Sequence, residues 1–408
     1  MGLNVILRAA VLSLAALCLS LGAAASVSAQ DVGGDISGGA GIFRAKNPET
    51  KKKSGAATKP ARTAGSTNPR VSNVAERIED LLDKGNEARD ARRFTEAEDA
   101  YKEILKLKAR DARAAYGLGN VYSDQQRWDD AEAAYRNSVT WAPTNADAYV
   151  ALSVALVQPR AGGDNAGRFA EAESFARRSV QLDPKNAVGW DRLGVALQAR
   201  GLANSETEHS YRRAIELDPQ FAVAYAHLAR MLNKVRPAEA APLYDKAVEL
   251  ARDPATLNLI AESLQAEQLW PQSEPVLKKA LELDARNPTS LMLMGRYLVV
   301  YKRYQEAEPY LKSAAEGSRA FTPFNLLGRA YLGMDRFGEA EATYEQASAF
   351  AGAGEKKQLA GSFGFEGVGD GYLKSNQKDK AVRAYQRALE LDPGNMGAAQ
   401  KLAKARAN

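Results

Sequence analysis

Apolar and small residues recur at helical spacing along most of the chain, and residues 112–145 show the pattern most clearly. In the first half of this stretch Leu118 and Tyr122 are four positions apart, and in the second half Ala131 and Tyr135 repeat the same spacing. Residues spaced in this way lie on one face of a helix. A short polar segment separates the two halves, so the pattern predicts two antiparallel helices joined by a tight turn.

The same pattern returns about every 34 residues, and Pro143 marks the end of one unit because proline cannot continue a helix. A period of this length is typical of solenoids built from helical pairs. We therefore expect an all-α solenoid over residues 71–395, closed at its end by a polar, basic capping helix at 396–408. The expected hairpins are 78–111, 112–145, 146–186, 187–221, 222–253, 254–287, 288–320, 321–354 and 362–395.

The repeated unit resembles the tetratricopeptide repeat, in which a bulky residue is followed by Leu-Gly, Tyr, Ala, an aromatic residue, Ala and Pro. The clearest further copies are Trp190, Leu193, Gly194, Leu197, Tyr211, Ala214 and Pro219, then Phe324, Leu327, Gly328, Tyr331, Phe337, Ala340, Tyr344 and Ala347, and then Phe365, Gly369, Tyr372, Ala381, Tyr385, Ala388 and Pro393. The resemblance implies about nine such hairpins wound into a right-handed superhelix. It says little about function, because this fold carries many roles.

The first 29 residues have the composition of a secretory signal peptide. One basic residue, Arg8, precedes an apolar run from about Ala9 to Leu21, and the small residues Val27 and Ala29 suit a cleavage site. A lipoprotein signal and an uncleaved anchor are the alternatives. No second apolar run of this kind follows, so we expect an exported protein, periplasmic or extracellular, without a membrane span after cleavage. Cleavage would also remove Cys18, the only cysteine.

Residues 30–70 are rich in Gly, Ser, Thr, Pro and Lys, and they offer too little apolar surface to offset the entropy of ordering. The sequence therefore predicts a disordered basic linker, with Lys51, Lys52 and Lys53 as a local cluster. Its simplest role is that of a spacer. Weak electrostatic attraction of residues 44–70 to an acidic envelope surface is the alternative.

The formal net charge of the 408-residue chain is +5, and the excess of positive charge lies in residues 30–70. Residues 30–70 hold eight basic and three acidic side chains, so the repeats are close to neutral. This distribution argues against nucleic acid as a partner along the solenoid.

The sequence gives little support for catalysis. The chain has two histidines, His209 and His227, which cannot alone complete a zinc site. Gly364 to Gly371 is glycine-rich but lies inside a helical repeat, so it does not meet the conditions for a dinucleotide loop. We predict no enzymatic activity, no cofactor and no metal.

Binding along the first helices of the hairpins is better supported. In the family that the chain resembles, these helices line a concave groove. Amide and guanidinium groups suit such a groove because they pair with peptide groups and carboxylates. The candidate ligand-binding residues are Tyr116, Asn120, Asp191, Arg230, Asn258, Arg296, Asn325 and Arg329.

The function expected from these observations is a non-catalytic scaffold of the bacterial cell envelope that binds other proteins or extended peptides. An accessory protein of a polysaccharide or protein export machine is the first alternative. The remote alternative is an enzyme with a site in the loops at 158–168 or 353–361.

Overall fold

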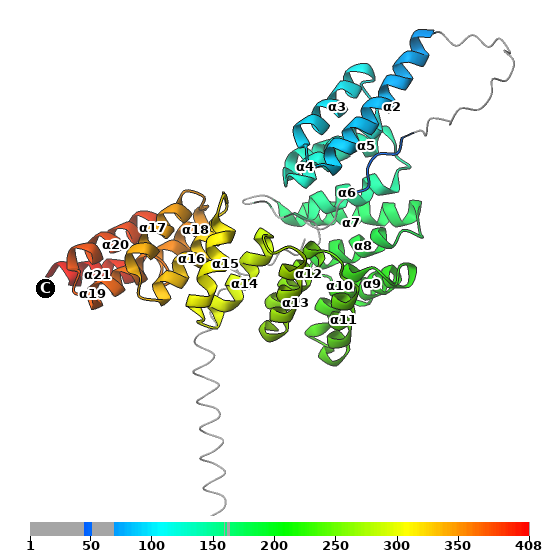
Figure 1. Ribbon diagram of the computed structural model, residues 1–408. Helices are drawn as coiled ribbons and strands as arrows, with labels where there is room; N and C mark the ends of the chain where they lie inside the picture. Colours follow the sequence, from blue (N-terminus) through cyan, green and yellow to red (C-terminus); the bar gives the residue numbers. More distant parts are fainter. Residues whose placement is uncertain (1–44, 51–68, 159, 161–163, 408) are drawn as a thin grey trace, which may run out of the picture. The chain divides into compact units, whose positions relative to one another are not determined.

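The computed structural model describes residues 45–50, 69–158, 160 and 164–407, and within these ranges every regular element is a helix. Consecutive helices pair into antiparallel hairpins (Figure 1), which confirms the expected all-α solenoid fold. The chain divides into two compact units, Met1–Leu250 and Ala251–Asn408. The expected signal peptide at 1–29 and the lysine cluster at 51–53 lie outside the described residues.

The described residues of the first unit form five hairpins, each made from a first and a second helix. Its helices are α2 (Pro69–Asp90), α3 (Phe94–Leu107), α4 (Ala112–Asp124), α5 (Trp128–Trp141), α6 (Ala146–Val157), α7 (Asn165–Leu182), α8 (Ala187–Ala199), α9 (Ser205–Leu217), α10 (Ala222–Asn233) and α11 (Pro237–Leu250).

The second unit continues the same arrangement. Its helices are α12 (Pro254–Ala266), α13 (Trp270–Leu283), α14 (Pro288–Val300), α15 (Tyr304–Ala315), α16 (Phe321–Gly333), α17 (Phe337–Ser348), α18 (Ala353–Ala360), α19 (Phe365–Lys374), α20 (Lys378–Leu391) and α21 (Met396–Ala407). The last helix, α21, packs against α20 and buries Ala398, Leu402 and Ala405.

The two helices of a hairpin approach closely because a glycine on the first faces a tyrosine on the second. In the α4–α5 hairpin, Tyr135 is fully buried, and a Cβ atom added to Gly119 would overlap its ring. The same contact joins Gly328 to Tyr344 and Gly369 to Tyr385. The Leu-Gly step of the repeat therefore has a steric cause.

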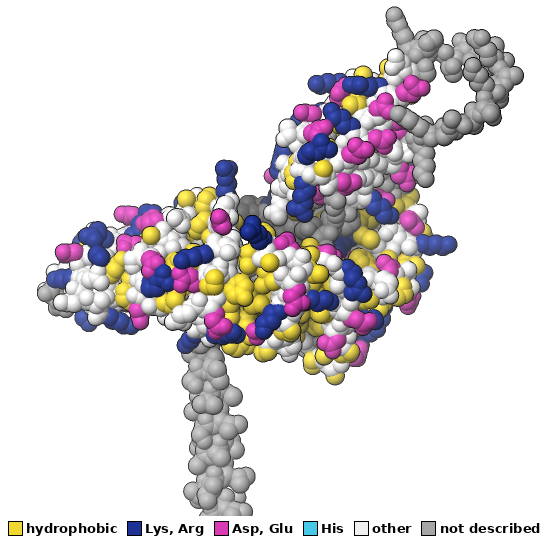
Figure 2. Space-filling view, in the orientation of Figure 1, with side chains coloured by type: hydrophobic (Ala, Val, Ile, Leu, Met, Phe, Trp, Pro, Cys, Tyr) yellow, Lys and Arg dark blue, Asp and Glu magenta, His cyan; other side chains and the backbone are white. Residues whose placement is uncertain are grey.

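Within each unit, a second recurring contact joins one hairpin to the next. A glutamate early in the second helix accepts hydrogen bonds from the following hairpin, as Glu308 does from Arg336 at 2.6 Å. The other such pairs are Glu98 with Tyr122 and Arg127, Glu132 with Arg168, Glu173 with Arg200, Glu208 with Arg236, Glu274 with Tyr297, and Glu341 with Tyr372. Acidic and basic side chains are accordingly interspersed over the face shown in Figure 2.

Two connections differ from the sequence-based expectation. Residues 353–360 form the helix α18 instead of a polar loop, because the Glu355 carboxylate accepts from the Gly352 amide at 2.7 Å and Leu359 and Ala360 are buried. In the inserted segment 158–168, α7 begins at Asn165. Residues 159 and 161–163 of that segment lie outside the described residues.

Among the described helices none is long and apolar enough to cross a membrane. Within the same residues, no group of three or more His, Cys, Asp and Glu side chains is placed to hold a metal ion.

Candidate functional site

The segment Ala45–Thr50 lies on the first helices of the first three hairpins, next to α6 in Figure 1. It forms no regular element, and Pro48 restricts the preceding Asn47 to an extended conformation. We call the surface that it covers on α2, α4 and α6 the first-helix face. Five residues inside the stretch for which the sequence predicts disorder, 45–49, are therefore placed in specific contact with the solenoid.

Two asparagines hold the main chain of this segment. Asn120 on α4 donates its Nδ2 hydrogen to the Lys46 carbonyl at 2.9 Å, and Asn86 on α2 donates to the Pro48 carbonyl at 3.1 Å. Each peptide carbonyl that leaves water needs a donor of this kind. Because the contacts involve the main chain, they recognise an extended backbone whatever its side chains are.

Two tyrosines orient these asparagines. The Tyr135 hydroxyl donates to Asn120 Oδ1 at 3.0 Å, and the Tyr101 hydroxyl donates to Asn86 Oδ1 at 2.7 Å. Because each amide oxygen is occupied by a hydroxyl donor, the amide nitrogen points to the segment. In these two hairpins the buried tyrosine thus fixes which end of the asparagine amide faces a ligand.

Arg89 is a large charged side chain buried on this face, with 1% of it exposed. It makes a bidentate pair with Asp124, at 2.7 and 3.0 Å, and donates through Nη1 to the Ala45 carbonyl at 2.7 Å and to Asn47 Oδ1 at 2.9 Å. Burial alone would lower the pKa of Arg89, but the hydrogen bond and charge of Asp124 outweigh it and raise that pKa, so the guanidinium stays charged.

Three further contacts complete the site. Asp90 accepts from Asn47 Nδ2 at 3.0 Å, so both ends of the Asn47 amide are paired. Arg113 Nη1 donates to the Glu49 carbonyl at 3.1 Å, and the Lys46 ammonium lies 3.9 Å from the Asp147 carboxylate on α6. Ala45 and Pro48 are buried, whereas Lys46 and Glu49 are exposed.

The structure places the sequence-predicted residues of the first unit in different surroundings. Asn120 contacts the segment directly, as described above. Tyr116 is buried on the same helix, 5.9 Å from the Tyr135 ring, and among the described residues its hydroxyl has no hydrogen-bond partner. Asp191 is fully buried and accepts from His227 Nδ1 at 2.8 Å, while Arg230 is half-buried on α10.

In the second unit, two of the predicted residues bind neighbouring helices. Asn258 donates to Asn287 Oδ1 at 3.1 Å, and Arg296 donates to Gln265 Oε1 at 2.7 Å. Burial lowers the pKa of Arg296. Asn325 is half-buried on α16, and the Arg329 guanidinium lies 5.0 Å from the centre of the Phe363 ring.

Sequence reasoning missed most of the residues that hold the segment. Asn86 was not among the candidate residues. A signal for it existed, because the Gly85-Asn86 pair recurs one repeat later as Gly119-Asn120. Arg89 carries no such signal. The residues absent from the prediction are Asn86, Arg89, Asp90, Arg113, Asp124 and Asp147.

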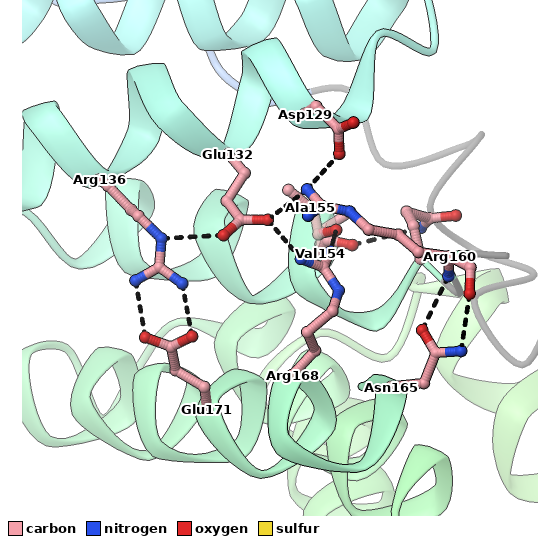
Figure 3. Close-up of polar contacts among 10 residues, drawn as sticks. Asp129, Glu132, Arg136, Val154, Ala155, Arg160, Asn165, Arg168 and Glu171 are labelled. Carbon is pink, nitrogen blue, oxygen red and sulfur yellow. Dashed lines mark hydrogen bonds and ion pairs between the residues drawn. The ribbon is translucent and has the colours of Figure 1, made fainter. Parts of the chain in front are cut away.

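A second polar cluster surrounds the inserted segment (Figure 3). Glu132 on α5 accepts from Arg168 at 2.6 Å, from Arg160 at 2.8 Å and from Arg136 at 2.9 Å. Arg136 also pairs with Glu171 on α7. These ion pairs fasten the insertion to the preceding hairpin, and because each charge already has protein partners we assign the cluster to structure.

We expect this cluster to contribute stability that depends on pH. Burial alone would raise the pKa of Glu132, but hydrogen bonds from Arg168 and Arg136 outweigh it and hold that pKa below the ordinary glutamate value of 4.5. The contribution of Glu132 to stability is therefore complete above pH 4.5 and is lost as the pH falls through the lower pKa of the folded state.

Glu132→Gln should lower the free energy of unfolding by about 1 kcal/mol at pH 7 and by much less at pH 3, as measured by urea unfolding. The control Glu216→Gln removes an exposed ion pair and should change the free energy of unfolding little at either pH. An equal loss of stability in Glu132→Gln at pH 7 and pH 3 would contradict the assignment of the cluster to structure.

Three segments match family models described as tetratricopeptide repeat, at residues 82–146, 323–350 and 363–395. The search of curated proteins found no match.

Several solved structures are similar to the chain. The crystal structure of MamA protein is 23% identical, with 49% of this chain and 96% of that chain covered and a TM-score of 0.33. The Cut9 and Hcn1 hetero-tetramer of APC/C matches at 15% identity over 83% of this chain and 64% of that chain, with a TM-score of 0.47. The pilF protein of Pseudomonas aeruginosa matches at 14% identity over 55% of this chain and 99% of that chain, with a TM-score of 0.41.

Proposed function

This chain is a tetratricopeptide-repeat protein, and we propose that it is a non-catalytic binder of extended peptides, which it holds on the first-helix face of α2, α4 and α6. The observation that carries the proposal is the seating of Ala45–Thr50 on that face, with Asn86 and Asn120 each donating to a main-chain carbonyl. An extended segment of a partner protein presents the same carbonyls at the same spacing.

The chemistry of the face suits holding a chain more than transforming it. Its amides and guanidinium groups donate to peptide carbonyls, and its carboxylates are paired with Arg89 and with the Asn47 amide. Hydrogen bonds of this kind contribute about 1 kcal/mol each. A site built from a few of them binds reversibly and depends on the ligand being extended.

The place of action is also part of the proposal. The signal-peptide pattern at residues 1–29 supports export to the bacterial cell envelope, where the protein would act as a scaffold. Fractionation of cells that produce the tagged chain tests this point, since recovery only in the cytoplasm would refute it.

The binding experiment needs a chain whose face is vacant. We define the opened chain as the full-length protein in which residues 45–50 are replaced by a Gly-Ser stretch of equal length. The face should survive this change, because Arg89 keeps its pair with Asp124. A fluorescein-labelled peptide with the sequence of residues 45–50 should bind the opened chain, as measured by fluorescence anisotropy. If neither this peptide nor a library of extended peptides binds, the proposed function fails.

Removing one tyrosine hydroxyl from the opened chain should weaken peptide binding without disturbing the fold. In Tyr135→Phe the Asn120 amide loses the donor that fixes its orientation, so we expect the affinity to fall about three- to tenfold, equivalent to about 1 kcal/mol. The matched control is Tyr344→Phe, at the same repeat position in the second unit, where the hydroxyl donates to the Phe363 carbonyl. An equal loss in both variants would show that the effect comes from general destabilisation.

A further inference from the structure

We propose that Ala45–Thr50 is an internal competitor: it occupies the first-helix face until a partner carrying a similar Asn-Pro segment displaces it. This inference rests on the proposed function and deepens it, because it names the ligand chemistry and the state of the free protein. Both the ligand chemistry and the state of the free protein follow from the contacts that the first-helix face makes with individual residues of the segment.

Asn47 is recognised through its side chain. Arg89 donates to its Oδ1 at 2.9 Å, and Asp90 accepts from its Nδ2 at 3.0 Å. The primary amide of asparagine offers an acceptor oxygen and a separate NH2 donor on one short planar group, which suits this pair of contacts. An aspartate here would place its carboxylate against Asp90, and glutamine would carry the amide one methylene too far.

Pro48 is the second selective position. It is buried, and its main chain is bound through the carbonyl, so the missing N–H of proline costs nothing at this point. Proline also holds Asn47 extended before binding, which lowers the entropy lost when the segment is ordered. An Asn-Pro pair is therefore both recognised and preorganised.

The remaining positions discriminate less. Ala45 is buried, so a small residue is required there, whereas Lys46 and Glu49 expose their side chains. The Lys46 ammonium is 3.9 Å from Asp147 and 74% exposed, a geometry that contributes little in water. The ligand is thus an extended segment with a small residue, any residue, Asn and Pro in succession.

The segment is attached to the face that it covers, since only residues 51–68 separate it from α2. A tether of this length gives an effective concentration on the order of 1 mM. For a segment whose Kd in trans is on the order of 0.1 mM, this effective concentration exceeds the Kd about tenfold. The face is then covered in about nine of ten molecules, and vacating it should raise the apparent affinity for an external peptide about tenfold.

The test compares the labelled peptide on the wild-type full-length chain, on the opened chain and on a full-length Asn47→Asp variant. We expect binding about tenfold tighter to the opened chain than to wild type, with Asn47→Asp close to the opened chain. Changing the peptide itself at its asparagine to aspartate should reduce affinity for the opened chain at least about tenfold, whereas alanine at its lysine or glutamate should change it less than about threefold.

Each contrary outcome has a distinct meaning. Equal affinity of the wild-type and opened chains would overturn internal competition while leaving peptide binding intact. Loss of binding with every peptide change would overturn the Asn-Pro selectivity alone. Analytical ultracentrifugation completes the test: a wild-type dimer that becomes monomeric in the opened chain would show that the segment binds a second copy, which would refute an internal role. Failure of all peptides on the opened chain would instead refute the proposed function.

Discussion

Arg89→Met is expected to lower the free energy of unfolding of the first two hairpins by about 3–5 kcal/mol. The Arg89 side chain is 1% exposed, and the Asp124 side chain is 15% exposed. Arg89→Met takes the bidentate guanidinium partner away from the largely buried Asp124 carboxylate, and losing one partner of a buried ion pair is among the costliest single changes in a protein. The segment 45–50 would also lose two hydrogen bonds, to the Ala45 carbonyl and to Asn47.

The measurement is amide hydrogen exchange over α2 and α4, since a stack of repeats need not unfold in one step. The double variant Arg89→Met, Asp124→Leu should recover most of the loss, because it removes both charges and leaves apolar groups of similar size. Equal exchange in the single and double variants would show that the cost arises from lost packing and not from the loss of the guanidinium partner of Asp124.

Gly119→Ala is expected to destabilise the α4–α5 hairpin by about 1–3 kcal/mol, although alanine is the better helix former. The new Cβ would overlap the Tyr135 ring, which is fully buried and whose hydroxyl is bound to Asn120. The ring cannot move aside without losing that hydrogen bond. The cost should therefore lie toward the upper end of the range, and peptide binding should weaken with it.

The matched control is Gly338→Ala on α17. Its new Cβ would meet only the Tyr372 hydroxyl, at the ordinary contact distance of 3.7 Å, so the substitution should be neutral or stabilise by a few tenths of a kcal/mol. Thermal unfolding followed by circular dichroism compares the two. A stabilising Gly119→Ala would mean that the glycine-tyrosine contact does not limit the approach of the helices.

The fold was largely predictable because it follows from local rules repeated along the chain. Within the stretch 112–145 the structure has the helices α4 (Ala112–Asp124) and α5 (Trp128–Trp141), whose contacts repeat in other hairpins. The stretch 353–361 was misread because it is polar, whereas its helix is decided by Glu355 at its start and by Leu359 in its last turn. Composition alone does not reveal such a short helix.

The site was less predictable because it depends on contacts between distant parts of the chain. Asn120 was selected from its repeat position, but the residue that it binds, Lys46, is 74 positions away in a segment without any repeat pattern. Asp191 and Asn258, which share the repeat position of Tyr116, were also selected as groove residues. They instead bind His227 and Asn287, because a first helix also faces the hairpin that follows it.

The place of the first-helix face within the stack has a consequence for how the protein exchanges its ligands. Terminal hairpins have a neighbour on one side only, so they open more readily than those inside an array. The segment 45–50 contacts α2, α4 and α6 and therefore links the three hairpins to one another. A partner peptide that displaces the segment would accept the same hydrogen bonds through its own carbonyls. The three hairpins would then stay held together while one ligand is exchanged for the other.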